Sequence, residues 1–180
     1  MHLRKGALKL SLELVEYQFP DPAIGWDANW LNVRLKLSLP DGRLWEVVDP
    51  CLTAQEAHQL VAWLEEVAEH APTFIGWQGA VLSSEESFTE PCLMIAARSP
   101  WFSHPEWDEQ LHLRVTLSSE YLPPFAHELD HSPAWAEAGE VSAAWLDFPV
   151  TQADLRELRA QWAAQVQRFP VRDPSRTPCR

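Results

Sequence analysis

One stretch of the sequence combines metal-binding residue types at a known spacing, His127-Glu128-Leu129-Asp130-His131. In zinc hydrolases this H-E-x-x-H spacing places both histidines on one face of an α-helix, and the glutamate acts as general base. Here Pro123-Pro124 lies just upstream and Ser132-Pro133 just downstream, so only a short helical turn fits between them. No third ligand is obvious. We interpret the stretch as a surface loop and expect no bound metal; a metal-dependent hydrolase remains one alternative.

Other kinds of catalytic site have no support in the residue pattern. The chain has only six glycines and no glycine-rich phosphate loop, and it lacks a G-x-S-x-G nucleophile elbow. Its three cysteines, Cys51, Cys92 and Cys179, form no C-x-x-C motif and have no recognisable catalytic partner. We therefore expect reduced thiols, no cofactor and no enzymatic activity. A Cys51–Cys92 bridge has only the similar settings of the two residues in its favour.

The charge of the chain is strongly negative and unevenly distributed. Residues 41–147 contain 19 Asp and Glu but three arginines, a net charge of −16, and the remaining segments contain 7 acids and 11 bases, a net charge of +4, which together give −12. Such a balance argues against binding to nucleic acid or to an anionic membrane, because both require basic surface. The acids indicate either the solvated side of a helix or a contact surface for a basic protein.

Ten tryptophans against two tyrosines are a second unusual feature. Trp45, Trp63, Trp145 and Trp162 occupy positions expected to face the core, whereas others fall in expected loops, where they either hold the loop to the body or anchor a partner. The residues that we predict to contact a partner combine such tryptophans with the acids; they are Glu65, Glu66, Glu69, Glu85, Glu86, Trp101, Trp107, Asp108 and Glu109.

Two kinds of hydrophobic period predict the elements that position these residues. Alternation predicts strands over 8–19 with a β-bulge near Leu14, over 31–39, through Trp45 and Val47 as far as Asp49-Pro50, near Phe88, and over 92–97, 111–117 and 141–148. Helical spacing after Thr53 and Thr151, each with an acid three residues on, predicts helices over 54–70 and 152–168. Residues 71–86 and 121–139 are expected to be loops.

These elements predict an α+β fold, with one antiparallel sheet of about five to six strands and two helices packed on one face. We expect one domain over residues 1–169 and a loose tail over 170–180. The first residues alternate polar with apolar and so do not form an export signal, and no stretch approaches the roughly 20 apolar residues of a membrane span. We expect a cytoplasmic location.

The segment Trp26-Asp27-Ala28-Asn29-Trp30-Leu31 opens the clearest strand. From its residue types it is a structural corner, in which Asp27 and Asn29 accept local backbone N–H groups, with a small-ligand pocket as the alternative. Together with Phe19-Pro20-Asp21, Asp49-Pro50-Cys51-Leu52, Phe88-Thr89-Glu90-Pro91-Cys92-Leu93 and Tyr121-Leu122-Pro123-Pro124, it resembles the bacterial WapI-type immunity proteins over about residues 8–169.

The resemblance implies a cytoplasmic protein that protects its producer by binding a contact-delivered toxin domain, often one that cleaves RNA. The matched residues Trp26, Asp27, Asn29, Trp30, Asp49, Pro50, Glu90 and Pro91 are expected to be architectural. Residues 99–109 and 126–139 look like additions to the family pattern. The resulting hypothesis is a non-catalytic immunity protein that blocks a nuclease toxin through an acidic surface. The rival binding hypothesis is a scaffold or small-ligand protein that uses the Trp-lined corner.

Overall fold

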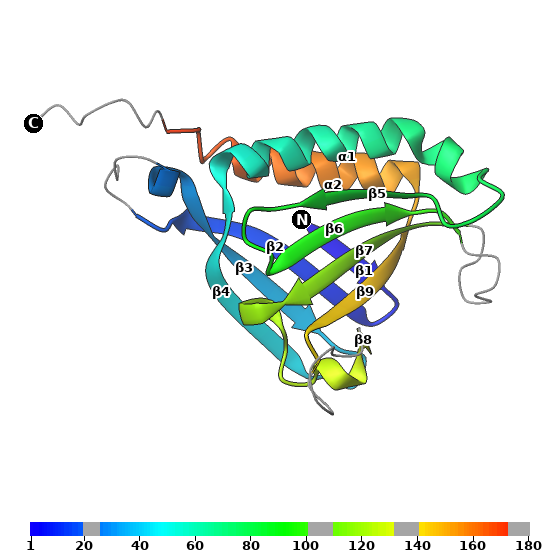
Figure 1. The fold of residues 1–180 in the computed structure, drawn as a ribbon, viewed down its shortest axis with the longest axis horizontal. Helices are drawn as coiled ribbons and strands as arrows, with labels where there is room; N and C mark the ends of the chain where they lie inside the picture. Colours follow the sequence, from blue (N-terminus) through cyan, green and yellow to red (C-terminus); the bar gives the residue numbers. More distant parts are fainter. Residues whose placement is uncertain (20–25, 101–109, 132–140, 173–180) are drawn as a thin grey trace, which may run out of the picture.

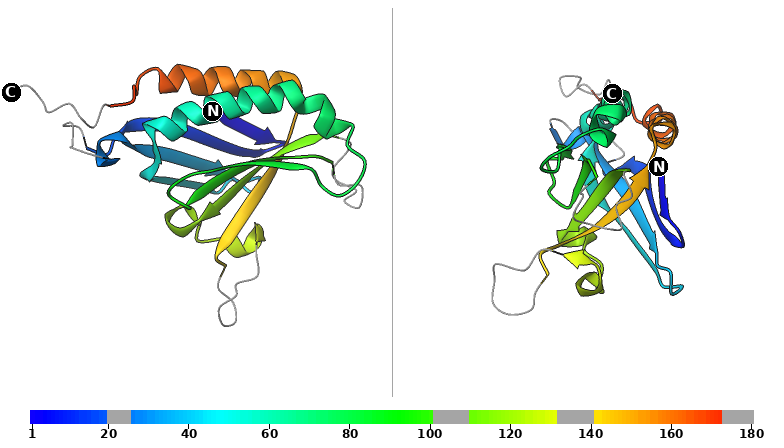
Figure 2. Two further views of the ribbon diagram at one scale, coloured as in Figure 1. Left: turned by 45° about the horizontal axis from the view of Figure 1, so that its top comes forward. Right: turned by 90° about the vertical axis from the view of Figure 1, so that its right-hand side faces the viewer.

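The computed structural model describes residues 1–19, 26–100, 110–131 and 141–172. Within these ranges nine strands form two antiparallel sheets, and two long helices lie side by side across the top of both (Figure 1, Figure 2). One continuous hydrophobic core joins the inner faces of the sheets to the buried faces of the helices. In the described part of the chain, no helix is long and apolar enough to cross a membrane.

The first sheet has the strand order β1-β2-β3-β4. Its strands are β1 (His2–Lys5), β2 (Leu8–Tyr17), β3 (Trp30–Ser38) and β4 (Leu44–Thr53). Alternate leucines along β2 and β3 are buried, and polar residues between them face outward. The register of β2 against β3 shifts between Leu14 and Glu16, which confirms the predicted bulge.

The second sheet has the strand order β5-β6-β7-β9-β8. Its strands are β5 (Ser83–Ser87), β6 (Leu93–Arg98), β7 (Leu111–Ser118), β8 (Asp130–His131) and β9 (Ala143–Val150). Three short 3-10 helices complete the described elements: η1 (Trp26–Asn29), η2 (Ser119–Tyr121) and η3 (Ala126–Glu128).

The helices α1 (Ala54–Ile75) and α2 (Gln152–Val166) each follow the last long strand of a sheet. Both begin with a complete capping box, Thr53 with Glu56 and Thr151 with Asp154, as the sequence predicts. The indole Nε1 of Trp162 donates to the carbonyl of Ala57 at 2.9 Å and joins the helices inside the core. The two halves of the chain thus share one plan, an antiparallel sheet followed by a capped helix.

The α+β class and the antiparallel pairing are confirmed, but the strands divide between two sheets and exceed the expected five or six. Alternation of apolar and polar residues shows which face of a strand is buried, but it does not show which strand lies beside it. The pattern therefore cannot distinguish one sheet from two. Strand β1 was not predicted because only one of its four residues, Leu3, is buried. Strand β5 was not predicted because Ser83-Ser84-Glu85-Glu86-Ser87 has no apolar residue. It forms at a sheet edge by pairing with β6.

The strand expected to end at Asp49-Pro50 and the helix expected to end at residue 70 both continue further. Pro50 lies inside β4, next to a register shift, in an edge strand where a missing N–H is tolerated. Pro72 lies in the last turns of α1, so the helix runs beyond residue 70 and shortens the predicted 71–86 loop. Because Pro72 has no N–H, the carbonyl of Ala68 lacks its helical donor. It instead accepts a hydrogen bond of 2.8 Å from Nε2 of Gln152 in α2.

The tryptophans follow the predicted core positions in part. Trp63 and Trp162 are buried, and Trp45 is half-buried against the core. Trp145 faces the opposite side of β9 from the buried Leu146 and lies under the Arg114 guanidinium, 4.7 Å from its ring centre, so its core assignment is wrong. Phe88 is buried but belongs to the β5–β6 connection and not to a strand.

Candidate functional site

A hollow of about 330 Å³ opens where the end of β4 meets the β5–β6 connection and η2. Four of the residues that carry the family resemblance, Trp30, Asp49, Pro50 and Glu90, line it together with Gln18 and Glu120. We call this site the acidic hollow, because the ionisable residues among its described lining are Asp49, Glu90 and Glu120. The three come from segments far apart in the sequence, so the fold assembles the site.

Backbone hydrogen bonds fix the β4 wall of the acidic hollow. Asn32 pairs with Pro50 and Leu31 pairs with Leu52, so Cys51 is the extra residue of a bulge in β4. The hydroxyl of the buried Tyr121 lies 2.7 Å from the carbonyl of Val33 and 3.0 Å from that of Asp49. Burial raises the pKa of Tyr121, so the hydroxyl stays protonated and remains a donor. Tyr121 thereby holds η2, and with it Glu120, beside Asp49.

The β5–β6 connection is held from two sides. Glu56 at the start of α1 accepts from the N–H of Thr89 at 2.6 Å with one carboxylate oxygen and from the N–H of Thr53 at 2.7 Å with the other. On the other side, Ser118 donates its N–H to the carbonyl of Cys92 at 3.0 Å and its hydroxyl to that of Pro91. Glu90 lies between these anchors, so its position is set by the backbone.

Burial favours the neutral form of Glu56, but the hydrogen bonds from Thr53 and Thr89 outweigh it and hold the pKa of Glu56 below its ordinary value. Its charge acts on Glu86 of β5. Burial, and then the nearby Glu56 carboxylate, raise the pKa of Glu86. Negative charge therefore gathers along the β5–β6 side of α1.

The carboxylates of the acidic hollow contrast with those acids of the described residues that pair with an arginine. Within the described ranges, Asp49, Glu90 and Glu120 form no ion pair, whereas Glu13 and Glu46 pair with Arg34. Because the three carboxylates line one hollow, a cation placed there interacts favourably with each of them. The arrangement therefore suits an ammonium or guanidinium group.

The structure separates the predicted contact residues. Glu65 lies on the α2 side of α1, where its carboxylate is 2.7 Å from Nε of Arg159, so its charge is compensated. Glu66 and Glu69 are exposed on the outer face of α1. Trp101, Trp107, Asp108 and Glu109 lie outside the described residues. None of the described members lines the acidic hollow.

Glu85 and Glu86 point to opposite faces of β5. Glu86 shares the face of Ser84, whose hydroxyl accepts from Nε1 of Trp63 in α1 at 3.1 Å. Glu85 is exposed on the other face. Adjacent acids on a strand therefore do not make one patch. Gln18 and Glu120 carry no sequence signal that links them to Asp49 and Glu90, which are expected to be architectural, because only the fold brings the four residues together.

The H-E-x-x-H stretch does not form the helix that a zinc hydrolase requires. Residues Ala126–Glu128 form a single 3-10 turn, and β8 begins at Asp130. The Glu128 carboxylate accepts from the Arg43 guanidinium, with one contact of 2.9 Å, and this hydrogen bond lowers its pKa. Among the residues with described positions, no group of three or more His, Cys, Asp or Glu side chains is arranged to hold a metal ion.

The Trp26–Asn29 corner has a structural role. The buried Asn29 donates from Nδ2 to the carbonyl of Arg172 at 3.0 Å and accepts from its N–H at 2.7 Å. These partners lie far along the chain and are not the local N–H groups expected, and Asp27 is exposed. The corner therefore secures the first residues of the predicted tail to the body.

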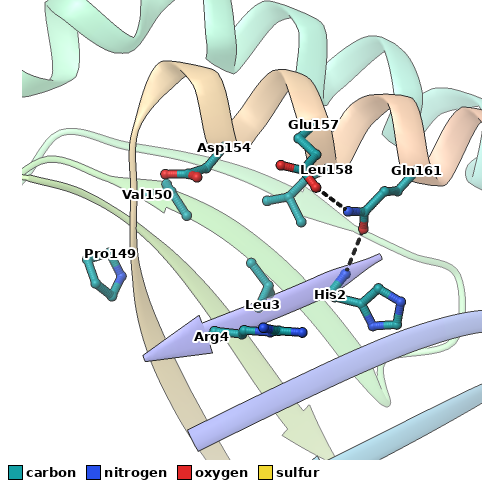
Figure 3. Close-up of a pocket in the computed structure, with 9 residues that line it drawn as sticks. All are labelled: His2, Leu3, Arg4, Pro149, Val150, Asp154, Glu157, Leu158 and Gln161. Carbon is teal, nitrogen blue, oxygen red and sulfur yellow. Dashed lines mark hydrogen bonds between the residues drawn. The ribbon is translucent and has the colours of Figure 1, made fainter. Parts of the chain in front are cut away.

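A second hollow, of about 410 Å³, lies between β1 and α2 (Figure 3). Several of its polar groups bond to one another or to the backbone. Gln161 accepts from the N–H of His2 at 3.1 Å and donates to Glu157 at 2.9 Å, and Asp154 closes the capping box of α2. These bonds join the first strand to the last helix, so we interpret this hollow as a structural junction.

Comparison with known proteins agrees with the resemblance noted in the sequence. No match is found among curated proteins. The model of the immunity protein WapI-like family matches residues 1–170 of the 180 residues, and so covers both sheets, both helices and the acidic hollow. The chain belongs to the immunity protein WapI-like family.

Proposed function

We propose that this protein is a non-catalytic, cytoplasmic immunity protein that binds a basic nuclease toxin domain and blocks it through the acidic hollow. The observation that carries the proposal is the convergence of the family-motif acids Asp49 and Glu90 with Glu120 around one uncompensated surface depression. Nuclease clefts bind polyanions and are therefore basic. A surface of matched opposite charge can occupy such a cleft.

The electrostatic strength of the site supports this role. At an effective dielectric constant of about 20, two unit charges about 4 Å apart interact by roughly 4 kcal/mol. Truncating one member of a desolvated interfacial charge pair costs about 2–5 kcal/mol. A lysine or arginine seated among the three carboxylates therefore contributes specificity as well as attraction. Because hydrogen bonds hold the backbone around Asp49 and Glu90, binding requires little ordering of the main chain there.

Co-expression with a candidate basic nuclease toxin domain tests immunity itself. Cells that produce the toxin should survive only when this protein is present. Death of the co-expressing cells contradicts immunity against that toxin.

A matched pair of variants tests the surface. D49N/E90Q removes two charges from the acidic hollow, and E66Q/E69Q removes two from the outer face of α1. We expect D49N/E90Q to weaken toxin binding by about 100-fold or more and to slow association at low salt, with E66Q/E69Q close to wild type. Circular dichroism of both variants checks that they fold. Loss of binding in E66Q/E69Q alone places the interface on α1 and contradicts the hollow.

A further inference from the structure

Two cysteines meet in the core directly beneath the acidic hollow. The Sγ atoms of Cys51 and Cys92 lie 3.2 Å apart, both residues are buried, and both are free thiols. Cys51 belongs to β4 of the first sheet, and Cys92 immediately precedes β6 of the second. The contact therefore bridges the two sheets.

Both cysteines stand outside the regular ladder of their sheets. Cys51 is the extra residue of the β4 bulge, since its neighbours Pro50 and Leu52 are the ones that pair with β3. Cys92 lies before the first paired residue of β6, Leu93. A disulfide requires an S–S distance of about 2.05 Å. The sulfurs must therefore approach by roughly 1 Å. Cys51 has no paired residue in β3, and Cys92 is held to β7 by one backbone hydrogen bond, from the N–H of Ser118 to its carbonyl.

The surroundings of Cys51 favour its protonated thiol. The hydrogen bond with Cys92, together with burial, raises the pKa of Cys51, so its thiol stays protonated. Since the thiolate is the reacting form, oxidation is slow and requires a small oxidant. The close approach of the second sulfur then favours an internal bond over further oxidation of the first.

We propose that Cys51 and Cys92 form a reversible oxidation site, at which a peroxide converts two thiols into one disulfide that joins the two sheets. One thiol gives up its proton, and the resulting thiolate attacks a peroxide oxygen. The O–O bond breaks to leave a sulfenic acid and hydroxide, which takes up the released proton to give water. The second thiolate attacks that sulfur and displaces hydroxide, which takes up a proton to give water. The two sulfurs lose two electrons in all, and one hydrogen peroxide becomes two waters.

The disulfide closes a loop that contains all of α1 and β5. Cross-linking restricts the unfolded chain, so the oxidised form should resist heat better. It should also fix the spacing of Asp49 and Glu90, because each lies two residues before one of the cysteines on opposite walls of the hollow.

The test uses the full chain with Cys179 replaced by serine, which leaves only this pair. After treatment with hydrogen peroxide, denatured protein should contain no free thiol, and its mass should fall by two hydrogens. The melting temperature should rise by roughly 5–10 °C and return to its starting value with dithiothreitol. The control is C51S in the same background, confirmed as folded by circular dichroism, which should show neither the mass loss nor the shift.

Two results overturn the proposal. The first is a mass increase from oxygen added to either cysteine with no loss of two hydrogens. The second is a count of two free thiols in the denatured protein after the peroxide treatment. C92S provides a second control if C51S fails to fold.

Discussion

Replacing Glu56 with glutamine tests the link between the first helix and the acidic hollow. The two carboxylate oxygens accept from the backbone N–H groups of Thr53 and Thr89, and one of them also accepts from the Thr53 hydroxyl at 2.8 Å. Glutamine keeps one acceptor oxygen and turns an NH₂ toward the other donors. Loss of a helix cap costs about 1 kcal/mol, and a hydrogen bond to a charged group is worth about 1.5–3 kcal/mol. Because Glu56 is half exposed to water, we expect E56Q to lose about 2 kcal/mol in all.

The pH dependence of this loss identifies its cause. The folded protein lowers the pKa of Glu56 below its ordinary value of 4.5, so the unfolded chain binds the proton first as the pH falls. The stabilisation by Glu56 is therefore fully present above about pH 4.5 and disappears as the pH falls through the lower folded pKa. E56Q lacks this contribution at every pH, so the difference between wild type and variant should shrink toward pH 3.

Urea unfolding of both proteins between pH 3 and pH 7 measures this difference. Both carry E86Q, because the charge of Glu56 raises the pKa of Glu86 and would otherwise add a second pH-dependent effect. T53A is the control that removes the cap hydroxyl and keeps the carboxylate. A difference between wild type and E56Q that is constant with pH refutes the reasoning, because it indicates lost packing and not a lost charged acceptor.

Two further predictions concern the interior. Q152A removes the side-chain donor to the Ala68 carbonyl, so it should cost about 1–2 kcal/mol. The cost should be smaller in a P72A background, where a new backbone N–H faces that carbonyl; a double-mutant cycle by urea unfolding measures this coupling, and additive losses contradict the assignment. D147A breaks two hydrogen bonds, of 2.8 and 2.7 Å, between the buried Asp147 and Arg114, so it should lower the free energy of unfolding by about 3 kcal/mol. E13A breaks the exposed pair with Arg34 and should cost under about 1 kcal/mol. Equal losses in urea unfolding contradict the role of burial.

The local architecture follows from the sequence wherever one residue pattern decides it. Leucines at every second position define β2 and β3, a change in their phase locates the bulge after Leu14, and a threonine followed by an acid locates both helix starts. Strand β5 and the continuation of β4 through Pro50 follow from tertiary pairing instead. A serine-rich segment becomes a strand because β6 offers it partners, and a proline remains in a strand because a sheet edge and a bulge remove the need for its N–H.

The acidic hollow lies beyond local pattern for the same reason. Asp49-Pro50-Cys51-Leu52 and Glu90-Pro91-Cys92-Leu93 repeat one order of residue types, 41 positions apart at their cysteines. Only the packing of the two sheets brings them face to face. The cysteines then meet in the core, and the acids line one hollow on the surface above them. Each of the two segments alone indicates only a strand boundary, but in the folded protein the two segments form opposite walls of the acidic hollow.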